Sequence, residues 1–294
     1  MKVLVSGING NIGFDVCKLL LERGYDLVGI DMQTRCLYES VNYHQCDITD
    51  YKQLDVIYNL YDDIEIVIHL AALISFDNSN QNIINVNSFG TYNLAHIANK
   101  HQAQKFIYLS SIPICRPQNE ILDEENFHDS PMSLYHYSKK FGEQILQMPY
   151  FSFSSIILRI SSPISRNLNI NTFFSKLVLN SINHKDIEIW GKGTRIQNYI
   201  DTRDIGFAII NAIKKDCSGI FFIGGESISN IDLAKKIVHM TNSRSTIKYK
   251  SNFTSDDMES WIISNEKSFR ELEYNPKYHI SDMIEKVISE VLQK

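Results

Sequence analysis

Short apolar runs alternate with amphipathic stretches along the first part of the chain, up to about residue 160. The runs are apolar almost without interruption, which is typical of parallel strands covered on both faces. The stretches between them repeat apolar residues at helical spacing, at residues 11–23, 50–61, 79–101 and 133–148. The apolar runs are KVLVS (2–6), YDLVGID (25–31), NYHQCDI (42–48), IEIVIHLAA (64–72), KFIYLSS (105–111) and FSSIILRI (153–160). This alternation predicts βαβ units and an α/β fold with a doubly wound, Rossmann-like parallel sheet.

The pattern loosens after about residue 165 and predicts a smaller α/β lobe towards the C-terminus. Helical spacing continues at 171–183, 203–214, 229–241 and 281–293, and strand-like runs occur at 187–190, 197–200 and 219–224. We expect residues 1–165 to form the cofactor-binding domain, with 203–224 returning to it. Residues 166–202 and 225–294 are then expected to form the smaller, substrate-binding lobe.

Composition and charge narrow the class of partner. The chain has 294 residues, 44% of them hydrophobic and 21% charged, as in an ordinary globular protein. Its formal net charge is −5, and no run of Lys and Arg is longer than two residues. A basic footprint for nucleic acid or an anionic membrane is therefore missing, and the expected partner is a small molecule.

The five cysteines indicate a reducing compartment. They are scattered, odd in number, and form neither a CxxC pair nor a metal-ligand spacing with histidine. No window of the sequence approaches 18 apolar residues, and the chain starts directly with a strand-like run. We therefore expect a cytoplasmic protein without a metal site or a membrane span.

The stretch GINGNIG (7–13) is the first candidate for chemistry. Gly7, Gly10 and Gly13 follow the first predicted strand and open the first predicted helix. At such a place backbone N–H groups and the positive end of the helix dipole face a pyrophosphate. The stretch, including Asn9, Asn11 and Ile12, therefore predicts a dinucleotide-phosphate site. The alternative is a glycine-rich turn without a ligand.

Asp31 specifies the dinucleotide. It ends the second predicted strand, 18 residues beyond Gly13, where an acidic side chain accepts hydrogen bonds from the adenosine ribose. A carboxylate there would repel the 2′-phosphate of NADP, so NAD is the expected cofactor. Asp47 closes the third run and could reach the adenine, although Asp47 and Asp50 could equally be turn and helix-cap residues.

Tyr135 and Lys139 are the candidates for proton transfer. They lie four residues apart in SLYHYSKKFGEQIL and so share one face of a predicted helix, which Ser133 or Asp129 could cap. Lowering the tyrosine pKa from about 10 to about 7 requires roughly 4 kcal/mol, which a nearby ammonium and a cationic nicotinamide could supply. Such a pair is expected once by chance in this chain, and the alternative is a solvated helix face.

Two serines strengthen the interpretation of Tyr135 and Lys139 as catalytic residues. Ser110 and Ser111 end the fifth predicted strand, at the edge where open α/β sheets bind ligands. A hydroxyl at Ser111 could hydrogen-bond the same substrate oxygen that Tyr135 protonates or deprotonates.

The ordered motifs resemble those of the extended short-chain dehydrogenase/reductases, the NAD-dependent epimerase/dehydratase family. The resemblance covers nearly the whole chain, and several motifs in register are more specific than any one alone. They are GINGNIG, Asp31, CDITD, HLAA (69–72), NVNSFGTYNL (85–94), YLSS (108–111), YHYSK (135–139), LRISSPIS (158–165), WGKGTRIQNYIDTRDI (190–205), IFFIGGESISNIDLAKKI (220–237) and SNEKSFRELEYNPK (264–277).

The resemblance implies an enzyme that acts on a nucleotide sugar. It implies Tyr135 as acid and base, Ser111 beside the reacting oxygen and Lys139 on the nicotinamide ribose. It also implies a homodimer formed by helices 85–101 and 133–148, whose outward residues Tyr92, Phe141 and Ile145 could serve that contact or cover the sheet. Further cofactor contacts are expected at Asp47, Ile48, Leu70, Ala71, Ala72 and Asn87, and substrate contacts at Ser75, Ser111, Ser162 and Arg195.

Departures from the family pattern concern the substrate. Members often carry Asn at Ser162, Gly at Ser165 and Tyr-Gly at Cys115-Arg116. An Arg that grips the diphosphate is commonly found near Gln197, where Arg195 or Arg203 could substitute. The Asp-Glu pair of a 4,6-dehydratase is replaced here by Ile112 and Pro113, which disfavours dehydration.

Three functions are compatible with these residues. An NAD-dependent epimerase would oxidise a sugar hydroxyl carbon, expected to be C4, to a keto intermediate and return the hydride to the opposite face. A reductase would instead take NADH from solution and reduce a 4-ketosugar. A non-catalytic NAD-binding regulator is the alternative of another class, although it has no need for Ser111, Tyr135 and Lys139. The sequence favours the epimerase narrowly.

Overall fold

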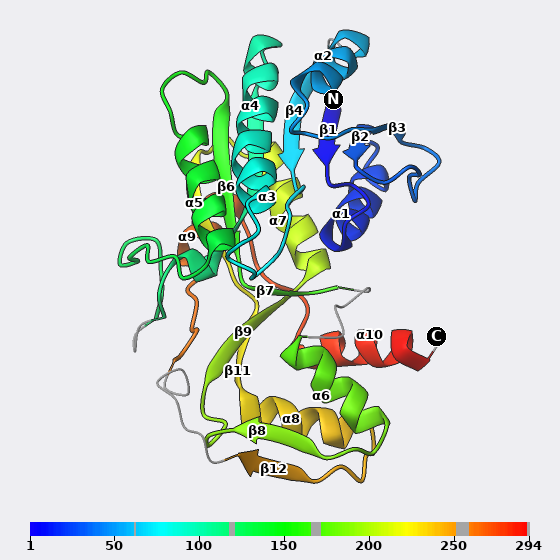
Figure 1. Cartoon of the computed structure of the whole chain (residues 1–294), viewed down its shortest axis with the longest axis vertical. Helices are drawn as coiled ribbons and strands as arrows, with labels where there is room; N and C mark the ends of the chain where they lie inside the picture. The colour runs from blue at the N-terminus through cyan, green and yellow to red at the C-terminus, as the bar shows by residue number, and fades with distance from the viewer. Residues whose placement is uncertain (62, 118–120, 166–171, 251–258, 293–294) are drawn as a thin grey trace.

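A seven-stranded parallel sheet organises the larger part of the molecule (Figure 1). The structure is a computed structural model that describes residues 1–294 except 62, 118–120, 166–171, 251–258 and 293–294. The strand order is β10-β6-β5-β4-β1-β2-β3, and all neighbours pair in parallel. The strands are β1 (Lys2–Ser6), β2 (Asp26–Asp31), β3 (Asn42–Gln45), β4 (Ile64–His69), β5 (Lys105–Ser111), β6 (Ser154–Ile160) and β10 (Gly219–Ile223). The predicted fold class is confirmed.

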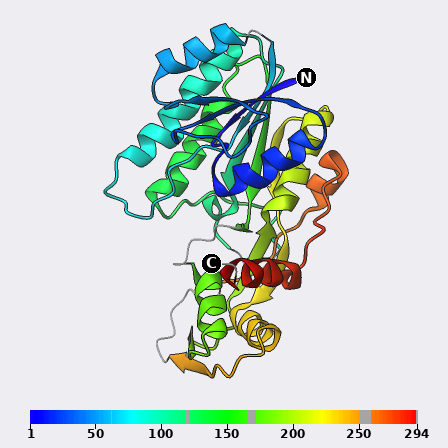
Figure 2. The same ribbon diagram turned by 90° about the vertical axis from the view of Figure 1, so that its right-hand side faces the viewer.

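Helices cover both faces of this sheet (Figure 2). α1 (Asn11–Leu21) and α7 (Thr202–Lys214) pack against each other on one face. α2 (Tyr51–Leu60), α4 (Thr91–Lys100) and α5 (Leu134–Leu146) cover the other. Successive strand residues alternate between the two cores, because side chains of a strand point to opposite faces. Val3 and Val5 belong to the core under α1, whereas Leu4 belongs to the core under α4.

The helix expected at 79–101 is interrupted by a wider turn. Its first residues 79–81 precede α3 (Asn82–Ile84), which runs into a π-helical turn, η1 (Asn85–Gly90), and then into α4. A π turn takes one extra residue and is frequent at functional sites. Nothing in the spacing of apolar residues indicates this turn.

The rest of the chain builds a smaller α/β lobe, the lower part of Figure 1. A three-stranded sheet, in the order β11-β9-β7, and the pair β12-β8 carry helices that share a separate hydrophobic core. The elements are β7 (Ser162–Ile164), α6 (Phe173–Ile182), β8 (Ile187–Trp190), β9 (Ile196–Asp201), β11 (Glu226–Ser229), α8 (Asn230–Met240), β12 (Ile247–Lys250) and α10 (Ile280–Leu292). Residues 171 and 293, at the ends of two expected helices, lie outside the described residues.

Several details differ from the expectation. β3 ends at Gln45 because the next residues form a turn, not the strand expected up to residue 48. β7, β11, β12 and α9 (Glu266–Leu272) were not expected. α9 packs on β10 and α7, although the range 225–294 was assigned to the smaller lobe. β10 itself pairs with β6, so a segment from the second half of the chain completes the main sheet.

A buried charge cluster joins the two parts of the molecule. Lys286 of α10 lies 3.2 Å from Asp201 Oδ1, 3.4 Å from Asp15 Oδ2 and 3.2 Å from Thr202 Oγ1. Asp15 belongs to α1, whereas Asp201 and Thr202 lie where β9 passes into α7. Both carboxylates are nearly inaccessible to solvent, so each needs this compensating charge. The cluster therefore fixes α10 against α1, the first helix of the larger domain.

Candidate functional site

The glycine loop between β1 and α1 packs too tightly for side chains at two of its three glycines. Gly7 has φ +72°, and a Cβ there would lie 2.6 Å from the backbone nitrogen of Ala71. A Cβ on Gly13 would lie 2.3 Å from the carbonyl oxygen of Gly7. Gly10 is exposed, and its Cβ would meet only that same oxygen, at 3.1 Å. The loop thus brings its backbone against β4 and leaves its outer side open.

The start of α1 fits a phosphate group. Gly10 is the N-cap and provides no side-chain hydrogen bond to the first amides of the helix. Backbone N–H groups at such a helix start, with the positive end of the helix dipole, can bind an anion. Exposed Asn11 begins this helix, and Ile12 packs on the core beneath it.

Asp31 is held beside this loop at the end of β2. Its Oδ2 accepts a hydrogen bond from the backbone N–H of Asn9 at 3.0 Å, and its Oδ1 accepts one from Gln33 at 3.2 Å. The Asn9 side chain donates to the carbonyl oxygen of Arg35 and accepts from the N–H of Leu37. The carboxylate is therefore positioned with lone pairs left for ribose hydroxyls. This arrangement fits the adenosine half of NAD.

In the segment after β3, Asp47 forms a turn and Asp50 caps a helix. Asp47 accepts hydrogen bonds from the N–H and hydroxyl of Thr49, at 2.9 and 2.7 Å, and so forms a turn. Asp50 caps α2 by accepting from Lys52 and Gln53. Ile48 is buried against Gly90, where a Cβ would lie 2.7 Å from the Ile48 side chain. Contact of Asp47 and Ile48 with the cofactor stays a prediction.

Asn87 joins the exit of β4 to the helix that carries Tyr135. Its Oδ1 accepts from the N–H of Leu73 at 2.7 Å, and its Nδ2 donates to the carbonyl of Leu73 and to Ser138 Oγ, both at 3.0 Å. Ser138 in turn donates to the carbonyl oxygen of Tyr135 at 2.7 Å. Leu70, Ala71 and Ala72 lie partly exposed on the segment between β4 and Leu73. The η1 turn therefore supplies the side chain that aligns this segment with α5.

A buried histidine beneath the site has a defined tautomer. Thr91 donates its hydroxyl to the carbonyl oxygen of Asn87, so it must accept from His69 Nε2–H, which lies 2.9 Å away. His69 Nδ1 then accepts from Ser6 Oγ at 2.6 Å. Burial, assisted by the charge of Lys139, holds the pKa of His69 well below its ordinary value. The neutral ring thus connects β1, β4 and α4.

Tyr135 and Lys139 lie on the first two turns of α5, which Ser133 caps in place of Asp129. Burial raises the pKa of Tyr135 to about 12. Burial also lowers the pKa of Lys139 to about 7, although the carboxylate of Glu143 acts in the opposite direction. Lys139 Nζ lies 4.0 Å from the centre of the Tyr108 ring. Without a further positive charge the chain therefore keeps the Tyr135 phenol protonated.

A fully buried ion pair joins α5 to β6. Glu143 of α5 accepts two hydrogen bonds from Arg159 of β6, at 2.8 and 2.6 Å. Arg159 also donates to Asp129 at 2.7 Å. Ser110 donates to Glu143 at 2.6 Å, so its hydroxyl is committed to this network. The hydroxyl of Ser111 has no hydrogen-bond partner among the residues that the structure describes, and it is the serine available to a substrate.

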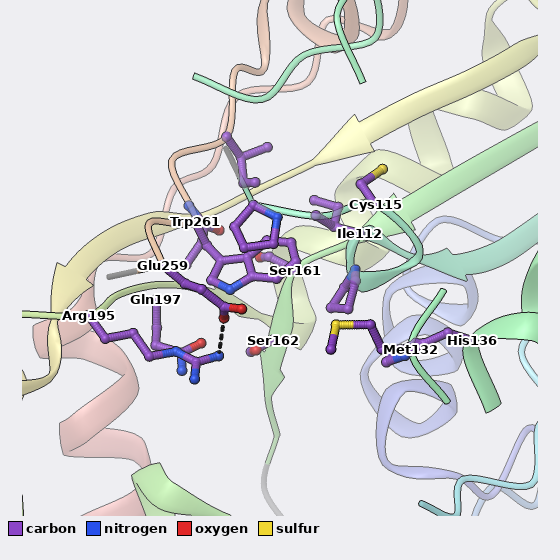
Figure 3. Close-up of a pocket in the computed structure, with 14 residues that line it drawn as sticks. Ile112, Cys115, Met132, His136, Ser161, Ser162, Arg195, Gln197, Glu259 and Trp261 are labelled. Carbon is purple, nitrogen blue, oxygen red and sulfur yellow. Dashed lines mark ion pairs between the residues drawn. The ribbon is translucent and has the colours of Figure 1, made fainter. Parts of the chain in front are cut away.

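A cavity of about 240 Å³ lies beside these groups, where the smaller lobe meets the carboxyl ends of β5 and β6 (Figure 3). Ile112 and His136, the residues after Ser111 and Tyr135, contribute to its wall. Arg195, Gln197 and Glu259 lie together at one end, and Met132 and His136 lie at the other. The full lining is Ile112, Pro113, Cys115, Pro117, Met132, His136, Ser161, Ser162, Arg195, Gln197, Asn198, Glu259, Trp261 and Ile263.

The residues expected to bind the substrate are therefore only partly brought together. Ser162 and Arg195 line the cavity, but Ser75 accepts a hydrogen bond from the N–H of Asp77 in a surface turn. Arg203 forms a two-point ion pair with Asp201 and stacks on Tyr278 at 3.5 Å, in a separate groove next to Gly10. Of the two arginines expected near Gln197, only Arg195 faces the cavity.

The sequence did not indicate several residues that lie at or beside the site. Glu143 follows Lys139 by four residues, so helical spacing could have found it. Tyr108 and Arg159 lie in apolar strands, and no local signal marks them as neighbours of α5. Glu259 and Trp261 reach the cavity from a segment whose pairing with β9 is not visible in its sequence.

In the described part of the chain, no three His, Cys, Asp or Glu side chains cluster closely enough to bind a metal ion. No helix among the described residues is long and apolar enough to cross a membrane.

Comparison with known proteins assigns a family to the chain. The model of the NAD dependent epimerase/dehydratase family matches residues 3–224. A UDP-glucuronate 4-epimerase of Thermodesulfobacterium geofontis is 25% identical, over 97% of this chain and 94% of that protein. The human dTDP-D-glucose 4,6-dehydratase is 25% identical, over 94% of this chain and 82% of that protein.

Solved structures share the fold over the full length. A Thermotoga maritima UDP-glucose 4-epimerase bound to UDP-glucose superposes with a TM-score of 0.89 at 21% identity, covering 100% of this chain and 99% of that one. A Bacillus cereus UDP-glucuronic acid 4-epimerase, in complex with UDP-glucuronic acid and NAD, gives 0.87 at 23% identity with the same coverage. Both likenesses establish the architecture of the two lobes.

The lowered pKa of Lys139 predicts a characteristic pH dependence of stability. The folded protein without cofactor releases this proton near pH 7, whereas the unfolded chain releases it near pH 10.4. Between these values the unfolded state binds more protons, so the free energy of unfolding gains up to about 1.4 kcal/mol per pH unit as the pH rises. Urea unfolding of wild type and Lys139→Met, both stripped of NAD, at pH 6.5 to 9 should show this rise in wild type only.

Lys235→Met, which removes an exposed lysine of α8, is the matched control and should keep the wild-type slope. Equal slopes in wild type and Lys139→Met would contradict the assignment of a near-neutral pKa to Lys139.

Proposed function

The chain belongs to the NAD-dependent epimerase/dehydratase family, and from that premise we propose that it is a UDP-sugar 4-epimerase that keeps its NAD bound. The observation that carries this proposal is the arrangement of α5. Tyr135 and Lys139 lie on its first turns, and the residues that follow Ser111 and Tyr135, Ile112 and His136, line a cavity of about 240 Å³. UDP-sugar 4-epimerases among the relatives and structural neighbours support the substrate class.

NAD, when bound, supplies reversible hydride transfer and a positive charge at the nicotinamide. Tyr135 takes the proton of the sugar C4 hydroxyl as the hydride leaves C4, which produces a 4-keto sugar. Ser111 donates a hydrogen bond to the same oxygen. Tyr135 would give this proton back to the C4 oxygen when the hydroxyl is formed again with the opposite configuration. Neither proton nor electron pair is lost over the cycle.

The pKa values explain why Tyr135 would work only with its cofactor. In the chain alone, burial keeps the pKa of Tyr135 near 12. A cationic nicotinamide and a protonated Lys139 would both favour the phenolate in this dry environment. The base is thus produced only in the complex that can also accept the hydride.

The residues after Ser111 support epimerisation over dehydration. Dehydratases of the family are expected to carry an Asp-Glu pair at the positions of Ile112 and Pro113. Ile112 is buried, and both residues form an apolar wall of the cavity. No carboxylate stands there to move a proton at the neighbouring carbon.

The first test is turnover together with cofactor content. We expect the purified protein, without added cofactor, to interconvert UDP-glucose and UDP-galactose or the corresponding uronic acids. Denaturation should release NAD at close to one equivalent, because the hydride never leaves the site. Protein that lacks NAD and consumes NADH with a 4-keto sugar would identify a reductase instead. Bound NAD without turnover of any sugar would indicate a regulator.

The second test removes the proposed acid and base. Tyr135→Phe should lower kcat by about a thousandfold, because a positioned acid–base group contributes 10²–10⁴-fold, while NAD stays bound. Tyr137→Phe is the matched control, since Tyr137 lies two residues away on the same helix and is 57% exposed. If Tyr135→Phe keeps most of the activity, Tyr135 is not the acid–base group.

A homodimer is the assembly we propose. On the outer face of α4 and α5, Tyr92 and Phe141 are 40% and 47% exposed, whereas Ile145 is buried against the sheet. Light scattering should give a dimer for wild type and a monomer for Phe141→Glu, because a buried unpaired charge disfavours the contact. Phe269→Glu is the control, since Phe269 is an exposed residue of α9 away from this face, and this variant should stay dimeric. A monomeric wild type would reject this assembly.

A further inference from the structure

An ion pair occupies the polar end of the cavity. Arg195 Nη2 lies 2.9 Å from Glu259 Oε2, and the side chains are 26% and 24% exposed (Figure 3). The backbone holds both partners in register, because Ile196 donates to the carbonyl of Glu259 at 3.2 Å and Trp261 donates to the carbonyl of Ile196 at 3.1 Å. The pair is therefore built into the pairing of two segments and does not depend on one flexible side chain.

This pair leaves the described wall of the cavity without net charge. Among the described lining residues, the charged side chains are Arg195 and Glu259. Burial lowers the pKa of His136, which favours its neutral form. Gln197, two residues from Arg195, also lines the cavity but is uncharged. A nucleoside diphosphate carries at least two negative charges, and Arg195 is the side chain here that can attract them.

Two polar atoms at this end are buried and have no hydrogen-bond partner among the described residues. They are Arg195 Nε and Ser161 Oγ. A guanidinium offers five N–H donors in one plane, so Arg195 can hold Glu259 through Nη2 while its Nε serves another acceptor. The Arg195 side chain thus keeps a donor that no described residue uses.

We propose that Glu259 determines the charge specificity of this cavity by competing with the anionic part of the substrate for Arg195. The carboxylate neutralises the cation that a diphosphate would use, so it weakens binding of the diphosphate but not of neutral groups. The choice of ligand rests on the proposed function, whereas the competition rests on the ion pair alone.

Calorimetric titration with UDP and with uridine tests the proposal without any turnover. Glu259→Gln keeps the shape of the side chain and frees Arg195, so UDP should bind about three- to tenfold more tightly than to wild type. The gain should shrink at high salt, because the site is partly exposed. The affinity for uridine should not change.

Two further variants sharpen the result. Glu188→Gln breaks a surface ion pair with Lys250 in the same lobe, outside the cavity, and should bind UDP as wild type does. Gln197→Arg adds a positive charge at the cavity and leaves Glu259 in place, so it should also tighten UDP binding.

The proposal is overturned if Glu259→Gln binds UDP no more tightly than wild type, if Glu188→Gln gives the same gain, or if neither wild type nor Glu259→Gln binds UDP. Weaker binding by Glu259→Gln would show instead that Glu259 accepts hydrogen bonds from the ligand. If the UDP affinities follow the expectation but no UDP-sugar is epimerised, this proposal stands and the proposed function fails.

Discussion

The buried ion pair between Glu143 and Arg159 is the interaction on which the geometry of the site depends. Both side chains are fully excluded from solvent, and removal of two charges from water is repaid only by close, multiple hydrogen bonds. Two such bonds join the pair, and Ser110 and Asp129 supply two more. Because α5, β5 and β6 each contribute a member, the angle between the helix and the strand ends has little freedom.

A second set of contacts connects that frame to β1 and β4, at the glycine-loop end of the same sheet. The Asn87 side chain bonds to Leu73, after β4, and to Ser138, which in turn donates to the backbone of α5. The backbone carbonyl of Asn87 accepts from the Thr91 hydroxyl, which itself accepts from His69. His69 must stay neutral to accept from Ser6, which its burial ensures. The strand that ends in the glycine loop and the helix that carries Tyr135 are thereby connected through directed hydrogen bonds.

The sequence predicts the main sheet well because its evidence is local. A strand covered on both faces must be apolar throughout, and a helix against it must repeat every three to four residues. The glycine loop, Asp31 and Asp50 could be interpreted because each acts on neighbouring backbone. β12 and the segment of Glu259 were missed because their edges are exposed or paired over long distances, and their composition carries no signal.

The contacts of two residues considered for the substrate site were not predicted from the sequence, and their contact with the substrate stays a prediction. Ser75 and Arg203 have side chains of the right chemistry at the right positions, yet each is already engaged by a neighbour, Asp77 in one case and Asp201 in the other. Both partners lie only two residues away in the chain, so these contacts are local. The resemblance to a family could not reveal them, since it transfers positions and not contacts.

The π turn at Asn85–Gly90 makes the orientation of α4 depend on the exact number of residues in this segment. Each residue of an α-helix turns the chain by about 100°. Loss of a single residue between Asn82 and Gly90 would convert the turn to ordinary helix and rotate either Asn87 or the whole of α4 by that angle. Substitutions on this stretch can be compensated locally, but a change in its length cannot, so insertions and deletions should be excluded here more strictly than in any neighbouring loop.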